Sequence, residues 1–311
     1  MDIDVVDPAL RASVLKIPKI DLRRRPVRVL VRWIGRHLLR AHPVPGVRTR
    51  DRRTEAVRVR TYVAAQPSTR AALLWIHGGG LVIGSARQDD RLCAETAARL
   101  GMTIVSAEYR HAPEAPFPAA LDDVYAVWQW MISTDSDLDI DPGRIVVGGE
   151  SAGGGLAASL VHLLHDTSAV QPIAQWLFCP MLDDRTAADR ALDRHDHWVW
   201  NNELNRLGWS SYLPVAPGAI AVPEYAVPAR RDDLAGLPPA WICVGDIELF
   251  LDEDTAYAER LREAGVEVEL DVIAGAPHGF ENWAAETPPA LALVARAQEW
   301  LSRTPGVRAP A

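Results

Sequence analysis

Short apolar segments alternate with amphipathic segments along most of the chain. Seven apolar segments have the length and residue types of buried strands. They cover residues 56–63, 72–77, 103–108, 144–149, 174–179, 240–245 and 267–273. Between and after them, apolar residues spaced three and four apart predict helices near 88–100, 117–132, 152–165, 252–265 and 289–302. This alternation predicts an α/β fold in which a mostly parallel central sheet is flanked by helices.

The N-terminal region contains a basic amphipathic segment. Apolar residues at helical spacing form one face, namely Val27, Leu30, Val31, Ile34 and Leu38. Arginines four residues apart form another face, namely Arg28, Arg32, Arg36 and Arg40. We expect the apolar face to pack on the body of the protein and the arginines to be solvated. A membrane surface or a partner is the alternative use of such a helix.

Composition narrows the class of protein. The chain has 311 residues, 48% of them hydrophobic, which suits one large folded core. No apolar run is long enough to span a bilayer, and the acidic Met1–Asp4 start does not resemble a signal peptide. The three cysteines, Cys93, Cys179 and Cys243, are far apart and show no metal-binding spacing. We therefore expect a cytoplasmic protein without cofactor, metal or stable membrane insertion; a homodimer is compatible with the sequence. The net charge of −8 disfavours a nucleic-acid partner.

The segment Gly149-Glu150-Ser151-Ala152-Gly153 has the pattern Gly-x-Ser-x-Gly. It follows the apolar strand segment 144–149 and precedes a small-residue helical segment. A serine at such a strand-to-helix turn sits on a sharp elbow that projects its hydroxyl above the sheet. The pattern predicts a nucleophile at Ser151; a glycine-rich turn without chemistry is the alternative.

A second glycine motif follows the strand predicted at 72–77. In His77-Gly78-Gly79-Gly80, backbone N–H groups without side chains can bind an oxyanion that forms on a substrate carbonyl. A phosphate-binding loop is the competing interpretation, but neither a Gly-Lys-Ser/Thr ending nor a G-x-G-x-x-G spacing is present.

One of the nine histidines stands out by its position. His278 lies in the loop 275–280, which follows the last predicted strand. It comes after Ser151 in the chain and leaves room for an acid between them. The chain order Ser, acid, His is that of the α/β-hydrolase triad.

These motifs resemble those of the hormone-sensitive lipase family of α/β-hydrolases, also called family IV esterases. The similarity runs from roughly residue 55 to residue 303, and the residues that carry it are 77–80, 108–114, 116–123, 149–154 and 277–280. The resemblance implies an α/β-hydrolase fold with a helical cap. It implies N-terminal cap helices in residues 1–50, a catalytic domain in 51–182 and 231–311, and a second cap segment in 183–230. Within that segment, Trp198, Trp200 and Trp209 either line an acyl pocket or serve ordinary packing.

The acid of the triad follows from register within that family. The family's acid is usually an aspartate four residues before an Asp-Glu pair and about thirty before the histidine. Here the pair is Asp252-Glu253, and both spacings point to Glu248. A glutamate departs from the family pattern, and Asp246 is the alternative. We expect the remaining acidic residues of this region to form the solvated start of a helix.

The sequence therefore predicts a carboxylic-ester hydrolase that acts on a small-molecule ester. Ser151 is the expected nucleophile, His278 the base and Glu248 the acid, with the N–H groups of Gly78, Gly79 and Ala152 as oxyanion hole. The resemblance further implies a preference for short acyl chains. The alternatives are an amidase or small-metabolite deacetylase on the same scaffold, and a non-catalytic receptor, which the presence of His278 disfavours.

Overall fold

A mixed eight-stranded sheet forms the centre of the protein in this computed structural model, which describes residues 1–134 and 136–307. The strand order is β1-β2-β4-β3-β5-β6-β7-β8. All neighbours from β4 to β8 are parallel, whereas β2 is antiparallel to β1 and β4. The strands are β1 (Val47–Arg53), β2 (Arg58–Ala64), β3 (Ala72–Ile76), β4 (Thr103–Glu108), β5 (Ile145–Glu150), β6 (Ala174–Phe178), β7 (Ala240–Gly245) and β8 (Val268–Ile273). The predicted α/β fold with a mostly parallel sheet is confirmed.

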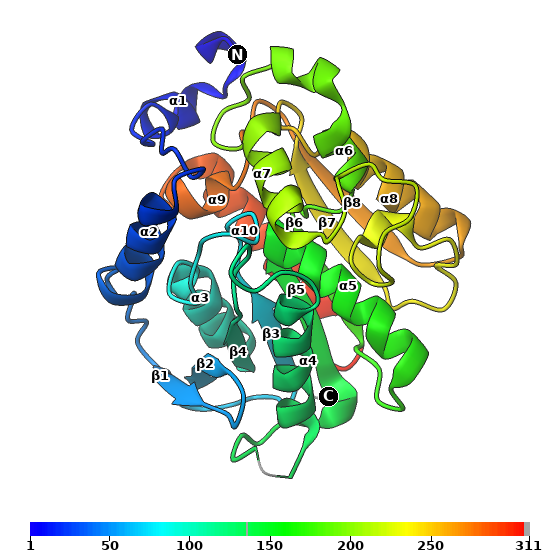
Figure 1. Cartoon of the computed structure of the whole chain (residues 1–311). Helices are drawn as coiled ribbons and strands as arrows, with labels where there is room; N and C mark the ends of the chain where they lie inside the picture. The colour runs from blue at the N-terminus through cyan, green and yellow to red at the C-terminus, as the bar shows by residue number, and fades with distance from the viewer. Residues whose placement is uncertain (135, 308–311) are drawn as a thin grey trace.

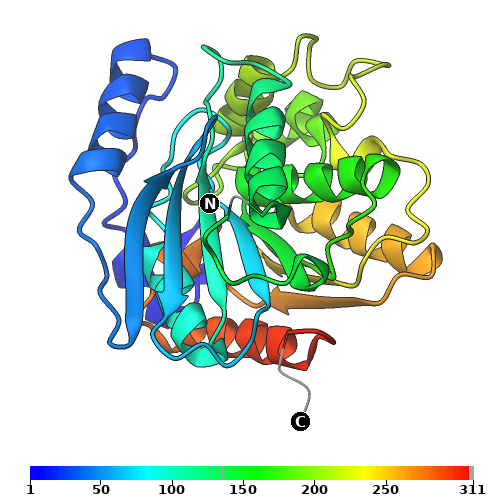
Figure 2. The same cartoon turned by 90° about the horizontal axis from the view of Figure 1, so that it is seen from below.

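Helices cover both faces of the sheet (Figures 1 and 2). Side chains alternate along β3, so that Leu73 and Trp75 join the core under one face while Leu74 and Ile76 join the core under the other. The first core contains residues of α1 (Pro8–Val14), α3 (Asp90–Leu100), α9 (Phe280–Trp283) and α10 (Pro288–Arg303). The second contains residues of α4 (Ala119–Ile132), α5 (Ala152–Thr167), α7 (Asn202–Tyr212) and α8 (Leu251–Glu263). Burial on both faces explains why the central strands are apolar throughout.

The irregular segment 183–230 contains α6 (Asp184–Ala188) and α7, together with short 3₁₀ turns at Arg190–Arg194 and Pro228–Arg230. Figure 1 shows α6 and α7 beyond the sheet, on the side of the molecule where α1 also lies. Residues 196–201, 203 and 204 of this segment line a cavity together with Ser151 and His278, each of which follows a strand. The segment therefore lies over the carboxyl ends of the parallel strands.

The sequence pattern missed one strand. β1 has the sequence Val-Arg-Thr-Arg-Asp-Arg-Arg and pairs with a single neighbour at the edge of the sheet. None of its seven residues is buried and only Val47 is apolar, so no apolar period marks it. Charged side chains on an edge strand discourage pairing with another molecule. β1 begins at Val47, within the segment 1–50 expected to form cap helices.

The expected orientation of the N-terminal amphipathic helix is wrong in part, because Val31 packs against the core but two of the arginines are also turned inward. In α2 (Arg25–His37), the Arg28 guanidinium is buried and donates to the carbonyls of Leu22 and Arg23. Arg32 donates to the carbonyls of Val82 and Ala112. Three of the five apolar residues face solvent instead, with Leu30 55%, Ile34 38% and Leu38 58% exposed. Backbone carbonyls of the neighbouring loops need donors, and the arginines supply them, which turns the apolar face outward.

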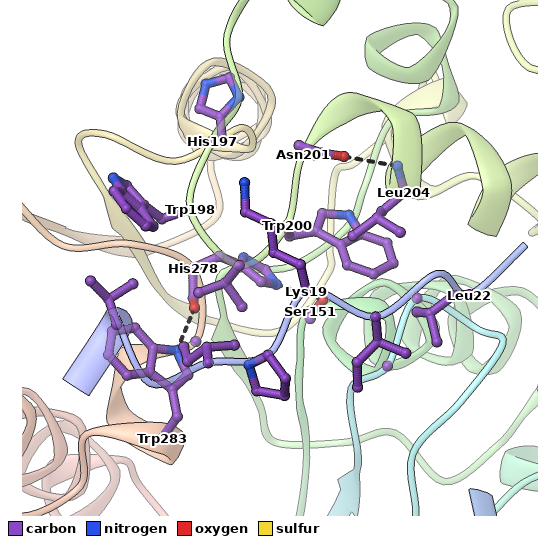
Figure 3. A pocket seen from close by; sticks show the side chains of 18 of the residues that line it. Lys19, Leu22, Ser151, His197, Trp198, Trp200, Asn201, Leu204, His278 and Trp283 are labelled. Carbon is purple, nitrogen blue, oxygen red and sulfur yellow. Dashed lines mark hydrogen bonds between the residues drawn. The ribbon is translucent and has the colours of Figure 1, made fainter. Parts of the chain in front are cut away.

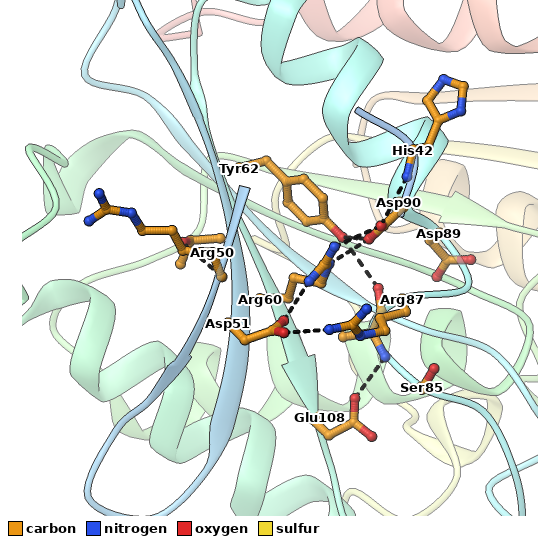
Figure 4. Close-up of polar contacts among 12 residues, drawn as sticks. His42, Arg50, Asp51, Arg60, Tyr62, Ser85, Arg87, Asp89, Asp90 and Glu108 are labelled. Carbon is orange, nitrogen blue, oxygen red and sulfur yellow. Dashed lines mark hydrogen bonds and ion pairs between the residues drawn. The ribbon is translucent and has the colours of Figure 1, made fainter. Parts of the chain in front are cut away.

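A buried ion pair fixes the start of α3 against the sheet (Figure 4). Arg60 on β2 donates to both carboxylate oxygens of Asp90, from Nε at 2.6 Å and from Nη2 at 2.8 Å. The Tyr62 hydroxyl donates to the same carboxylate at 2.6 Å, and Arg60 also contacts Asp51 on β1. Burial and the Asp90 charge raise the pKa of Tyr62, so the hydroxyl keeps its proton. Because Asp89 precedes Asp90, this pair also fixes a residue beneath the candidate site.

Asp90→Ala is expected to lower the free energy of unfolding by about 3 kcal/mol, because it leaves the Arg60 charge buried without its main partner. Urea unfolding monitored by circular dichroism measures the change. Asp139→Ala is the matched control, since it removes the partner of the exposed Arg70, and it should cost less than about 1 kcal/mol. Equal losses in the two variants would contradict the role given to the buried pair.

Candidate active site

Ser151 occupies a strained turn between β5 and α5. Its backbone angles are φ 54° and ψ −121°, which L-amino acids rarely adopt. The turn is tight because α5 begins directly against the end of β3. A Cβ placed on Gly153 would lie 2.0 Å from the Ile76 carbonyl oxygen, so only glycine fits there. The Ser151 side chain consequently stands at the end of the sheet, where the loops after β3 and β8 meet it.

The structure brings Ser151, His278 and Glu248 together (Figure 3 labels the first two). Ser151 Oγ lies 2.9 Å from His278 Nε2, and Glu248 Oε2 lies 3.2 Å from His278 Nδ1. All three residues are buried, with exposed fractions of 4%, 6% and 5% for Ser151, His278 and Glu248. The Phe250 ring packs edge-on against the imidazole at 5.2 Å, and Trp283 Nε1 donates to the His278 carbonyl. The position of the imidazole is therefore fixed by the Phe250 ring and by the hydrogen bond to the backbone carbonyl of His278.

Asp246, the alternative acid, has a different environment. Its side chain accepts a hydrogen bond from the backbone N–H of Gly275 at 2.7 Å, and the residue is exposed. This bond holds the loop that carries His278 but does not involve the imidazole. Of the two acidic residues, Glu248 is therefore the one that contacts His278.

The loop 77–80 passes directly over the serine turn. A Cβ on Gly78 would lie 3.3 Å from Ser151 Cβ, and Gly79 has φ 118°. Within the described part of the chain, the N–H groups of Gly78 and Gly79 make no hydrogen bond. The N–H of Ala152 belongs to the first residue of α5 and has no partner within the helix. Three donors are thus present around Ser151 and are available to an oxygen atom bound beside it.

A cavity of about 760 Å³ opens above Ser151. Trp198, Trp200 and Trp283 contribute to its wall, whereas Trp209 is buried and does not line it. The Trp200 ring lies against Gly80, where a Cβ would come within 2.1 Å of it. Two ion pairs cross the rim, Lys19–Asp196 at 3.0 Å and Arg23–Glu203 at 2.9 Å. The N-terminal segment and the segment after α6 therefore enclose the cavity from two sides.

Two buried carboxyl groups share a donor beneath the site. Asn282 Nδ2 donates to Asp89 Oδ1 and to Glu150 Oε2, both at 2.7 Å. Trp75 Nε1 donates to the other oxygen of Asp89 at 2.7 Å. Burial raises the pKa of both carboxyl groups, and the nearby Asp89 charge raises that of Glu150 further. Asn282 thus links the loop before α3, the serine turn and α9, which follows His278.

Cys179 and Glu281 extend this buried polar cluster. Possible ligand atoms of Cys179, Glu248 and His278 lie within 4.8 Å of one another, as do those of Glu150, Cys179 and Glu281. Burial raises the pKa of the Cys179 thiol, and a protonated thiol is a poor metal ligand. Burial raises the pKa of Glu281 and the nearby His278 lowers it, and the net result is a pKa of about 7.

Sequence reasoning missed several of these groups. Asp89, Asn282 and Glu281 belong to no recognised pattern, and only their distance in space from Ser151 identifies them. The acidic residues at the start of α8 were expected to be solvated, which is wrong for Glu253 and Asp254, both buried. Glu253 Oε1 accepts hydrogen bonds from the N–H groups of Leu182 and Asp183, where the chain leaves the sheet.

Comparison with known proteins identifies one family. The family Abhydrolase_3, described as alpha/beta hydrolase fold, matches residues 73–282. Carboxylic ester hydrolase LipN of Mycobacterium tuberculosis is 35% identical over 68% of this chain and 57% of its own length. The matched part therefore spans little more than half of that relative. Carboxylesterase NlhH of the same species is 32% identical over 74% of this chain and 73% of its own length.

Solved structures give the same result over nearly the whole chain. A bacterial heroin esterase superimposes with a TM-score of 0.90 and 34% identity, covering 99% of both chains. Esterase LipW from Mycobacterium marinum superimposes with a TM-score of 0.86 and 35% identity, covering 97% of this chain and 96% of its own.

Glu281→Gln is expected to make stability less dependent on pH. Because the pKa of Glu281 is raised from 4.5 to about 7, the folded protein keeps a proton that the unfolded chain has already released. This group therefore lowers the free energy of unfolding by about 3 kcal/mol as pH rises from about 4.5 to about 7.

Urea unfolding at about pH 5 and about pH 8 tests this. The difference in free energy of unfolding between the two pH values should be smaller for Glu281→Gln than for the wild type. Glu263→Gln, an exposed substitution at the end of α8, should behave as the wild type does. An unchanged pH dependence in Glu281→Gln would contradict the raised pKa.

Proposed function

Because the chain belongs to the Abhydrolase_3 family of alpha/beta hydrolases, the hormone-sensitive-lipase-like family IV, we propose that it hydrolyses carboxylic esters through Ser151, His278 and Glu248. The observation that carries this proposal is the continuous chain of contacts from Glu248 through the imidazole to the serine hydroxyl. The carboxylesterase and heroin esterase relatives support the reaction class.

Acylation begins at the Ser151–His278 contact. With Nδ1–H donated to Glu248, the Nε2 lone pair faces the hydroxyl and accepts its proton as Oγ attacks the ester carbonyl. The Glu248 carboxylate holds this tautomer and stabilises the imidazolium that forms. A buried glutamate satisfies this role as an aspartate does, because its Oε2 reaches Nδ1.

The negative charge that develops on the carbonyl oxygen is received by the N–H groups of Gly78, Gly79 and Ala152. These donors are fixed by the backbone before substrate binds, so little reorganisation is needed in the transition state. His278 then gives its proton to the leaving alcohol as the ester C–O bond breaks. Water, deprotonated by the same imidazole, attacks the acyl-enzyme and releases the acid.

We further propose a preference for short acyl chains. Trp200 lies against Gly80 and 6.4 Å, ring to ring, from His278. A bulky indole at this place limits the space beside the reacting carbonyl, while the rest of the cavity remains free for the alcohol part.

Ser151→Ala is expected to lower kcat on p-nitrophenyl acetate by roughly 10⁶-fold, the usual scale for losing a triad nucleophile. The same variant should no longer react with a fluorophosphonate probe, because the Oγ that attacks phosphorus is gone. Mass spectrometry of the labelled wild-type protein should place the adduct on Ser151. Ser210→Ala, at an exposed position of α7, is the control and should keep full activity. Turnover of p-nitroanilides without turnover of esters would instead indicate an amidase.

Glu248→Gln and Asp246→Asn separate the two acidic residues. Glu248→Gln should lower kcat by about 10⁴-fold, because a neutral amide neither fixes the tautomer nor stabilises the imidazolium. Asp246→Asn should lose far less, since its oxygen accepts from a backbone N–H that an amide oxygen also satisfies. Both measurements need circular dichroism to show that the variants fold. A larger loss in Asp246→Asn than in Glu248→Gln would overturn the assignment of the acid.

A further inference from the structure

The outward face of α2 carries a strip of large apolar side chains. We define the apolar strip as Leu30, Trp33, Ile34 and Leu38, which are 55%, 49%, 38% and 58% exposed. Three of the four lie within α2, and Leu38 is the residue at which the helix ends. Isolated apolar side chains on a surface need no explanation. Four apolar side chains spaced three or four residues apart on a helix, in contrast, form a contiguous surface.

The strip cannot turn inward without breaking the contacts of the opposite face. Arg32 donates to two backbone carbonyls and to Glu114, and Arg36 Nε contacts Glu108 at 2.6 Å. Arg28 is buried with two further carbonyls as partners. Rotation of the helix would leave these donors and acceptors unpaired, which costs more than the exposed apolar surface. Exposure of the strip is therefore built into the way α2 is attached.

The surroundings of the strip are strongly basic. Residues 22–50 contain nine arginines and no aspartate or glutamate, in a chain whose net charge is −8. The side chains of Arg24 and Arg25, at the start of α2, are each 76% exposed, although they also lie 3.1 Å from Asp21 and 3.6 Å from Glu114, respectively. Arg40, just beyond the other end, is exposed as well. An apolar strip thus lies between positive charges at both ends of one helix.

We propose that the apolar strip of α2 docks on an anionic lipid surface, with the helix lying in the plane of the interface. Apolar residues on one side and arginines at the flanks are the features that hold a helix at the boundary between headgroups and acyl chains. Each exposed arginine adds attraction to anionic lipids. No described helix is long and apolar enough to cross a bilayer, so the contact is peripheral.

Charge favours a lipid surface over a second copy of the chain. A two-fold contact through the strip would bring the arginines of one copy against those of the other, and like charges oppose that contact. An anionic surface complements the same arginines. The position of the strip also suits this partner, because the segment 14–23, which lines the cavity above Ser151, leads directly into α2. Docking would bring the cavity close to lipophilic molecules dissolved in the lipid.

Co-sedimentation of the full chain with vesicles tests the proposal without measuring activity. The wild type should bind vesicles of phosphatidylglycerol mixed with phosphatidylcholine, and high salt should weaken the binding. Leu30→Gln/Ile34→Gln should lower the partition coefficient roughly tenfold or more, through loss of buried apolar surface. Arg24→Gln/Arg25→Gln should lower it roughly fivefold per arginine.

Leu291→Gln is the matched control, because Leu291 on α10 is an apolar residue of similar exposure, 47%, outside the strip. It should bind as the wild type does. Equal binding to vesicles of phosphatidylcholine alone, or no binding to anionic vesicles, would overturn the proposal. A dimer that the Leu30→Gln/Ile34→Gln variant disperses, seen by analytical ultracentrifugation in the absence of lipid, would assign the strip to a second copy instead.

Discussion

The contact between the start of α5 and the end of β3 sets the geometry of the whole site. Gly153 lies so close to the Ile76 carbonyl that no side chain fits between them. Beside this contact Ser151 has a positive φ, and a Cβ on Gly78 would lie only 3.3 Å from the Ser151 Cβ. The nucleophile and the N–H donors of the following loop are thus fixed by one piece of backbone packing. Strain at the serine is offset by the full burial of β5, which leads into it, and of the neighbouring strand β3.

Beneath this contact, the protein concentrates acidic groups rather than apolar ones. Asp89 and Glu150 share Asn282 as a donor, and Glu281 lies beside them. Burial raises the pKa of all three carboxyl groups, which favours their neutral forms. The carboxylate that contacts the imidazole of His278 directly is that of Glu248.

Features that depend on a local sequence pattern, such as motifs and buried strands, could be predicted well from the sequence. The face that a helix buries could not. Ser151, the 77–80 loop and the central strands were recognisable because short motifs and apolar periods are local properties. β1 was missed because an edge strand buries little, and Val47 is its only apolar residue. The helix at 25–37 was expected, but the face it buries was not, since carbonyls of distant loops decide it. Asn282 illustrates the remaining limit, because its partners come from two other elements far away in the chain.

The attachment of α2 through arginines has a consequence for sequence change. Arg32 contacts Val82 and Ala112 only through their backbone oxygens. A backbone oxygen is present at these positions whatever the side chain. A substitution therefore keeps the acceptor for Arg32, provided that the backbone does not move and the new side chain does not block the guanidinium. Val82 and Ala112 are both buried, so packing limits which side chains fit there, but their hydrogen bonds with Arg32 do not depend on that choice. The arginine itself has no equivalent replacement. The attachment of α2 is accordingly specified by the residue type of the donor on the helix and not by the residue types of the acceptors in the loops.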